Sequence, residues 1–163
     1  MSINCRLQAV DAATTVQLAA HPVRAPLSLV RVQGPRCDIH KAWHAIHYVL
    51  TGAADGGEPP DCYLLDGGTV LGPPGDEDDG YGPPRLLRPE QVQAFNEVLQ
   101  PIRRLSLLRE RFDHAGMVSA GVYSINDGGE DEDLEFTAHF FKGLRKFIQA
   151  AAERGDGVVV SMY

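Results

Sequence analysis

The sequence predicts a single α+β domain, in which a small mixed or antiparallel sheet is covered by several helices. Residues 3–10 alternate between apolar and polar side chains, which is the period of a half-buried strand. Residues 130–154 repeat apolar side chains every three or four positions, which indicates a long amphipathic helix. Residues 158–160 are consecutive valines, which indicate a short terminal strand buried on both faces. The length of 163 residues fits one domain, residues 1–163.

The first strand is expected to lead into a short helix and a connection. Asp11 is a typical N-cap, and Pro22 ends a helix whose inward residues would be Val16, Leu18 and Ala19. Residues 21–36 contain three prolines and predict a connection with a short extended piece at residues 27–32.

Residues 38–50 predict a second amphipathic helix that stops at Gly52. Its apolar face consists of Ile39, Trp43, Ile46 and Leu50. Trp43 is expected to be a buried anchor, because a large aromatic side chain contributes most when it is removed from water.

Three histidines, His40, His44 and His47, recur at i, i+4 and i+7 along this predicted helix. Histidines four residues apart on a helix can bind zinc. However, three ligands on one straight helix spread over about two turns, so tetrahedral closure is difficult. We therefore expect no metal site, and we expect His47 to lie at the core margin with a hydrogen-bond partner.

Residues 52–84 form a long loop rich in glycine and proline, with an acidic run at residues 76–79. A linker between domains is the alternative, but neither flank is long enough to fold independently. The sequence therefore predicts a long loop within one domain. Only residues 63–65 and 69–71 are expected to reach the core.

The second half of the chain predicts a helical pair, a strand and the long helix. Pro89 is a good first helical residue, and it precedes an apolar stripe of Val92, Phe95, Leu99 and Ile102. A short helix with Leu105, Leu108 and Phe112 inward and a strand at residues 121–125 should follow. We expect residues 3–9 and 158–161 to share one sheet, with burial of Trp43, Phe95, Phe140, Leu144 and Phe147.

Four segments, residues 38–52, 69–72, 81–92 and 111–123, resemble the YfbM-like family of small bacterial proteins, grouped as domain of unknown function 1877. The resemblance covers nearly the whole chain and implies the family's fold, but the family has no established common biochemistry. Members commonly have Asp where this chain has His40 and His44. They also tend to have Asn, Pro and Trp where it has Val118, Ser124 and the turn at residues 126–128.

Composition argues against several classes of protein. A net charge of −7 disfavours binding to nucleic acid and suits either a basic partner or simple solubility. No apolar segment approaches the roughly 20 residues that span a bilayer, so no membrane association is expected. Cys5, Cys37 and Cys62 form no Cys-x-x-Cys pair, and no secretory signal is visible. These features favour a cytoplasmic protein without a cofactor.

The sequence favours a non-enzymatic protein-interaction module over an enzyme. It contains no Gly-x-Ser-x-Gly elbow, no Gly-x-Gly-x-x-Gly motif and no Walker sequence. The sharper hypothesis is an immunity-type protein that binds and neutralises a basic bacterial toxin through its acidic runs. The candidate partner-binding residues are Asp76, Glu77, Asp78, Asp79, Glu130, Asp131, Glu132 and Asp133.

The alternative is a small-molecule-binding protein or hydrolase with a pocket under the long loop. Its candidate residues are Trp43, His47, Tyr81 and Arg85. An arginine at position 85 can clamp a carboxylate or phosphate. The structural alternative for Arg85 is a set of hydrogen bonds to loop carbonyls or to an acidic neighbour.

Overall fold

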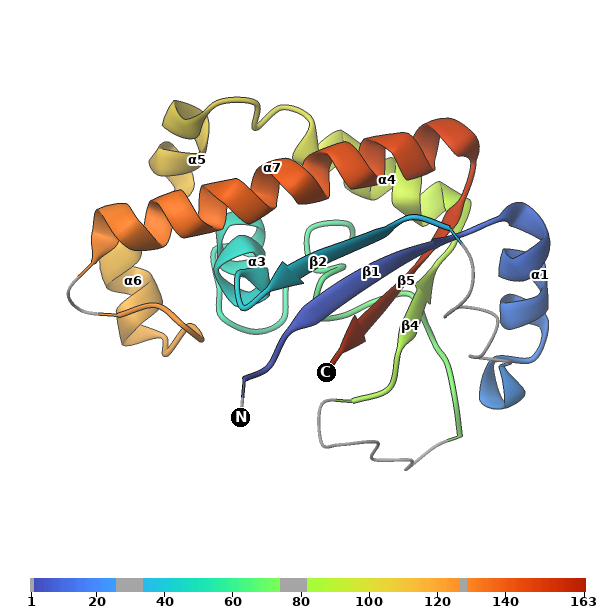
Figure 1. Cartoon of the computed structure of the whole chain (residues 1–163). Coiled ribbons are helices and arrows are strands. Elements are labelled where there is room, and N and C mark those ends of the chain that lie inside the picture. Colours follow the sequence, from blue (N-terminus) through green and yellow to red (C-terminus); the bar gives the residue numbers. More distant parts are fainter. Residues whose placement is uncertain (1, 26–33, 74–81, 127–128) are drawn as a thin grey trace.

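The computed structural model describes residues 2–25, 34–73, 82–126 and 129–163. The strands form a five-stranded antiparallel sheet with the order β2-β1-β5-β4-β3. Figure 1 shows one long helix near the C-terminus running across this sheet. This confirms the predicted α+β fold. In chain order the elements are β1 (Cys5–Val10), α1 (Ala12–Ala20), η1 (Pro22–Arg24), β2 (Arg36–His40), α3 (Trp43–Thr51), β3 (Thr69–Val70), β4 (Arg85–Leu87), α4 (Pro89–Leu99), α5 (Leu105–Arg111), α6 (His114–Ser119), α7 (Glu130–Arg154) and β5 (Gly157–Met162).

The two ends of the chain form the centre of the sheet. Strands β1 and β5 pair over their whole length, from Cys5 opposite Met162 to Val10 opposite Gly157. The prediction that the terminal segments share one sheet is therefore confirmed. Because β5 also pairs with β4, the apolar segment Val158–Val160 has a neighbour on each side.

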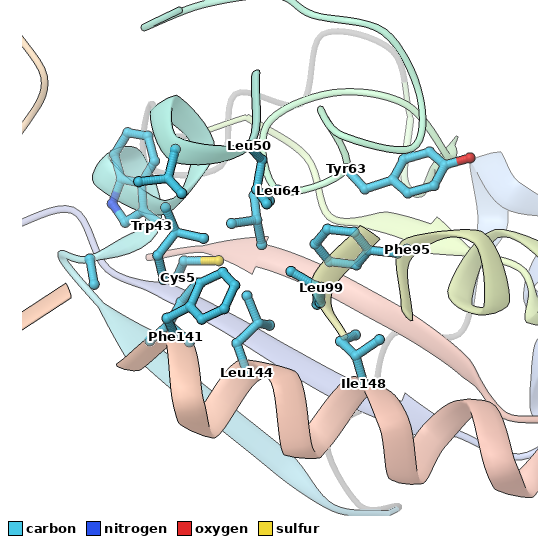
Figure 2. Close-up of a cluster of buried hydrophobic side chains, with 14 of the residues drawn as sticks. Cys5, Trp43, Leu50, Tyr63, Leu64, Phe95, Leu99, Phe141, Leu144 and Ile148 are labelled. Atoms are coloured by element: carbon cyan, nitrogen blue, oxygen red, sulfur yellow. The ribbon is translucent and has the colours of Figure 1, made fainter. Parts of the chain in front are cut away.

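The sheet carries a large core on one face and a small one on the other. On the first face, Leu7, Leu87 and Val160 pack with residues of α3, α4 and α7. Figure 2 shows this cluster, with Phe141, Leu144 and Ile148 pointing into it from α7. On the second face, Leu18 of α1 packs with four apolar residues, Val10, Leu71, Leu86 and Val159.

Helix α7 buries a different stripe from the one predicted. Phe141 and Leu144 are buried, whereas Phe140 and Phe147 are only partly buried and Phe136 is 42% exposed. The predicted burial of Phe140 and Phe147 is therefore wrong, although burial of Trp43, Phe95 and Leu144 is confirmed. The reason is the position of α7 beside the edge strand β2, where the ring of Phe140 contacts His40 edge-on at 5.3 Å.

The helix predicted over residues 38–50 is wrong in its first part. Residues 36–40 form strand β2, which pairs with β1, and the helix α3 begins only at Trp43. His40 ends the strand with a φ of 46°. The C-terminal boundary is confirmed, since Gly52 has the left-handed φ of 77° that a glycine helix cap requires.

Other local predictions are mixed. The Asp11 side chain caps α1 by accepting a hydrogen bond from the Thr14 N–H at 2.7 Å, as expected. Val16 and Leu105, both predicted to face inward, are 68% and 46% exposed. The strand predicted at residues 121–125 is wrong, because the Val122 N–H bonds back to the Met117 carbonyl and closes α6. The extended piece predicted at residues 27–32 lies outside the described residues.

Among the described residues, no helix is long and apolar enough to cross a membrane.

Candidate functional site

The negative charge of the chain is concentrated in one segment. Residues 42–84 contain eight of the 22 acidic residues and no Lys or Arg, whereas the remainder contains 14 acidic and 15 basic residues. All eight carboxylates of this segment belong to the long loop that follows α3, so the excess of negative charge comes from that loop. Four of these carboxylates, which belong to Asp55, Glu58, Asp61 and Asp66, lie in the described part of that loop.

Residues 52–68, here called the acidic loop, are packed against the core. Tyr63 and Leu64 are 6% and 0% exposed, which confirms that this part of the loop reaches the core. Figure 2 shows Leu64 beside Leu50 and the ring of Tyr63 beside Phe95, which it contacts edge-on with the ring centroids 5.9 Å apart. The side chains of Asp55, Glu58 and Asp66 remain exposed. The exposed carboxylates are therefore attached to a loop that is held against the core by Tyr63 and Leu64.

Arg85 of β4 holds the backbone of the acidic loop in place. Its guanidinium donates hydrogen bonds to the carbonyl oxygens of Leu64 at 2.8 Å, Gly67 at 2.9 Å and Tyr63 at 3.4 Å. Burial lowers the pKa of Arg85, and the nearby Asp66 acts in the opposite direction. The structural alternative for this arginine, a set of bonds to loop carbonyls, is confirmed.

Trp43 and His44 use their polar atoms within the fold. The indole N–H of Trp43 donates to the Ile3 carbonyl at 3.1 Å, and its ring stacks on His44 at 4.6 Å. The Nδ1 of His44 accepts from the Tyr123 N–H at 2.8 Å, and its Nε2 lies 2.9 Å from the Ala54 carbonyl. Because a carbonyl can only accept, His44 is the Nε2–H tautomer. Both side chains brace the fold.

His47 is fully buried, and its surroundings differ from the prediction. Neither of its ring nitrogens has a hydrogen-bond partner among the described residues, so the expected partner at the core margin is wrong. Burial lowers the pKa of His47, and His44 and Arg85 act in the same direction. Asp55 and the backbone of Gly56 act in the opposite direction, each more weakly than burial. The imidazole is therefore held in its neutral form.

We expect His47 to make the protein sensitive to acid. Below the unfolded-state pKa of about 6.5, the unfolded state binds a proton that the buried neutral histidine does not bind. The free energy of unfolding is therefore highest above this pH and falls as the pH drops below it. Chemical unfolding of the wild type between pH 7.5 and 5 should therefore show a falling free energy of unfolding. In His47→Leu the fall should be shallower, by up to about 1.4 kcal/mol per pH unit. Parallel pH profiles for the two proteins would contradict this assignment.

The residues of the predicted ligand pocket are not brought together as expected. Arg85 lines a hollow of about 200 Å³ with Leu65, Val70 and Val160, but neither Trp43 nor His47 lines it. Tyr81 lies outside the described residues.

Burial raises the pKa of Cys5 to about 12 and of Cys37 to about 11, so both thiols are protonated and unreactive at neutral pH.

The three histidines considered as metal ligands and disfavoured on their spacing are likewise separated by the fold, because His40 belongs to a strand and His44 and His47 belong to α3. In the part of the chain that the structure describes, no group of three or more His, Cys, Asp or Glu side chains is placed to hold a metal ion.

The four acidic residues at the start of α7 differ in their contacts and in their exposure. The carboxylate of Asp133, only 14% exposed, accepts from His114 Nε2 at 3.0 Å and from the Asn126 N–H at 3.1 Å. Asp131 pairs with Arg109 at 3.1 Å on the surface. Glu130 and Glu132 are exposed. Full exposure of the run is therefore wrong for Asp133, and the second candidate run, Asp76–Asp79, lies outside the described residues.

The acidic loop itself was missed by the sequence analysis. Its carboxylates are spaced three to five residues apart and do not form a run. The signal that would have revealed them is the absence of Lys and Arg from residues 42–84, a signal that depends on counting charge over a long window.

Comparison with known proteins identifies the family and the fold. The family model described as domain of unknown function (DUF1877) matches residues 1–161. A crystal structure of YfbM from Escherichia coli, described as a protein of unknown function, is similar with a TM-score of 0.68 and 18% sequence identity. The similarity covers 98% of this chain and 99% of that one. Comparison with curated proteins gave no match. The chain belongs to the DUF1877 family.

Proposed function

We propose that this DUF1877 protein is a non-enzymatic protein-interaction module that binds a basic partner through the acidic loop. The observation that carries the proposal is the segregation of charge: residues 42–84 account for the entire net charge of −7. Asp55, Glu58 and Asp66 place part of that charge on the surface of the described loop. A basic partner would therefore be attracted to this segment, because the remainder of the chain carries almost no net charge.

The way in which the loop is held supports binding. Three carbonyls of the loop are bonded to Arg85, and Tyr63 and Leu64 are buried in the core. A surface that is ordered before binding loses less conformational entropy when the complex forms. The fixed carboxylates would also steer a cationic partner toward the loop and raise the association rate.

In its sharper form, the proposal is an immunity-type protein that masks the basic surface of a bacterial toxin in the cytoplasm. Charge complementarity supports this form, because toxin surfaces that contact nucleic acid are basic. The three free thiols of Cys5, Cys37 and Cys62 agree with a reducing compartment. Glu130 and Glu132, exposed at the start of α7, are a secondary contact in this proposal.

The test is affinity capture from the native cell lysate, followed by binding kinetics with the captured partner. The triple variant Asp55→Asn, Glu58→Gln, Asp66→Asn should slow association about tenfold or more at low salt, and it should flatten the salt dependence. Its stability should change little, because Asn at position 66 can still accept the hydrogen bond from the Gly67 N–H.

A matched control removes the same charge elsewhere. The variant Glu97→Gln, Glu110→Gln, Glu153→Gln neutralises three exposed carboxylates outside residues 42–84. When both variants are compared at about 0.1 M salt, where the Debye length is about 10 Å, it should leave the association rate within about a factor of two. Equal effects of the two triple variants would mean that only the net charge matters, and the acidic loop would lose its assigned role.

A further inference from the structure

A groove of about 430 Å³ lies between residues 102–108 and one flank of α7. Figure 1 shows α5 beside the first half of this helix. The apolar part of the groove is lined by Ile102, Leu105, Leu108, Ala138 and Phe141. Its volume falls within the range of small-molecule sites, roughly 300–1,000 Å³.

The polar lining of this groove is basic, although the protein is acidic. It contains one carboxylate, that of Glu135, the imidazole of His139, and four cations, Arg103, Arg104, Lys142 and Arg145. None of the four cations forms an ion pair with a carboxylate of the described residues. The groove is therefore a local excess of positive charge next to the half-exposed side chain of Leu105.

Two of the arginines are directed at the same atom. Arg103 Nε donates to the Gln100 carbonyl at 3.2 Å, and Arg145 Nη1 lies 3.4 Å from the same oxygen. Gln100 is itself held, because its side-chain amide donates to Asn96 Oδ1 at 2.7 Å and to the Arg145 carbonyl at 3.2 Å. Two guanidinium groups thus converge without a compensating carboxylate. A bound anion would turn their mutual repulsion into two charge-assisted interactions.

Leu105 gives a second reason to expect a ligand. Its spacing from Leu108 and Phe112 predicts an inward side chain, yet it is 46% exposed and lines the groove. A ligand with an apolar body would cover mainly Leu105, because Leu108 and Phe141 are already almost fully buried and form the floor of the groove. Removing the exposed part of Leu105 from water would favour binding.

We propose that this groove binds a small amphipathic anion, in which a carboxylate or phosphate head is attached to a short apolar body. The head binds Arg103 and Arg145, with Lys142 and Arg104 at the rim, and the body lies over Leu105, Leu108 and Phe141. This site is independent of the acidic loop and of its proposed protein partner.

Isothermal titration calorimetry with four probes tests the proposal on the full chain. Octanoate and octyl phosphate carry both features, octylammonium carries the apolar body with the opposite charge, and acetate carries the charge alone. We expect octanoate or octyl phosphate to bind at least about tenfold more tightly than octylammonium and acetate, since charged hydrogen bonds and apolar burial each contribute. The preference between the two anions identifies the head group.

Substitutions locate the binding site. Arg145→Gln and Arg103→Gln should each weaken binding of the preferred anion about tenfold. Arg154→Gln removes the same charge from the far end of α7 and should leave affinity unchanged. Because Arg103 is exposed, its variant should keep the wild-type unfolding temperature, which separates loss of binding from loss of folding.

Three results would overturn the proposal. The first is equal binding of octanoate and octylammonium, which would show nonspecific apolar contact. The second is an equal effect of Arg154→Gln and Arg145→Gln, which would show dependence on net charge alone. The third is absence of binding by both octanoate and octyl phosphate.

Discussion

Replacement of Phe141 by alanine is expected to cost about 3–5 kcal/mol of the free energy of unfolding, the range for truncating a buried aromatic residue. Phe141 is 3% exposed, and Figure 2 shows its ring pointing from α7 into the core beside Leu144. The same substitution at Phe140, which is only partly buried over β2, should cost about 1–2 kcal/mol.

The two variants control for each other. Each changes phenylalanine to alanine in the middle of one helix, so the gain in helix propensity is the same. The difference in their urea midpoints therefore reports burial alone, provided that both have the wild-type m-value. Equal destabilisation, or a larger loss for Phe140→Ala, would mean that α7 is rotated on the sheet relative to this structure.

This pair also shows what the sequence can and cannot predict. The three- and four-residue spacing of apolar side chains correctly predicts the long helix and its end at Gly155. However, Phe136, Phe140 and Phe147 widen the apolar stripe beyond the buried part. Which flank of the stripe faces the sheet depends on the position of α7 beside β2. The residue pattern of one helix carries no information about the position of a neighbouring strand.

The prediction of the boundary between β2 and α3 was wrong for a related reason. Ile39, Trp43 and Ile46 have helical spacing, but Ile39 lies in a strand and the other two lie in a helix. Pairing with β1, including the Arg6–Asp38 ion pair at 2.8 Å, outweighs the local preference. Tertiary pairing of this kind often overrides a short helical pattern. The same boundary separates His40 from His44 and His47.

The candidate sites were only partly predictable. The bonds of Arg85 to loop carbonyls follow from placing an arginine where a Gly- and Pro-rich loop returns to the sheet. The groove beside α7 combines residues 103–104 with residues 142–145, and these segments are distant in sequence. Their convergence on the Gln100 carbonyl requires the packing of α4 against α7, so the sequence alone did not indicate it.

Replacement of Arg85 by methionine is expected to cost about 3–5 kcal/mol, because it removes the charged donor of three loop carbonyls at once. Methionine keeps much of the length and apolar stem of arginine, so the loss reports the hydrogen bonds more than the packing. Arg85→Lys should lie between the wild type and Arg85→Met, since an ammonium group keeps the charge but lacks the planar fork that spans these oxygens.

The loss should be concentrated in the acidic loop. Hydrogen exchange of the amides in residues 57–68 should accelerate strongly in Arg85→Met, whereas the amides of the β1–β5 pair should exchange only as fast as the lowered global stability requires. If the proposed interaction is correct, the variant should also bind the basic partner more slowly, although every carboxylate is still present. Unchanged exchange in residues 57–68 would show that Tyr63 and Leu64 hold the loop without Arg85. In that case the loop would owe its order to apolar packing, and only the neutralisation of Asp55, Glu58 and Asp66 would be expected to slow association.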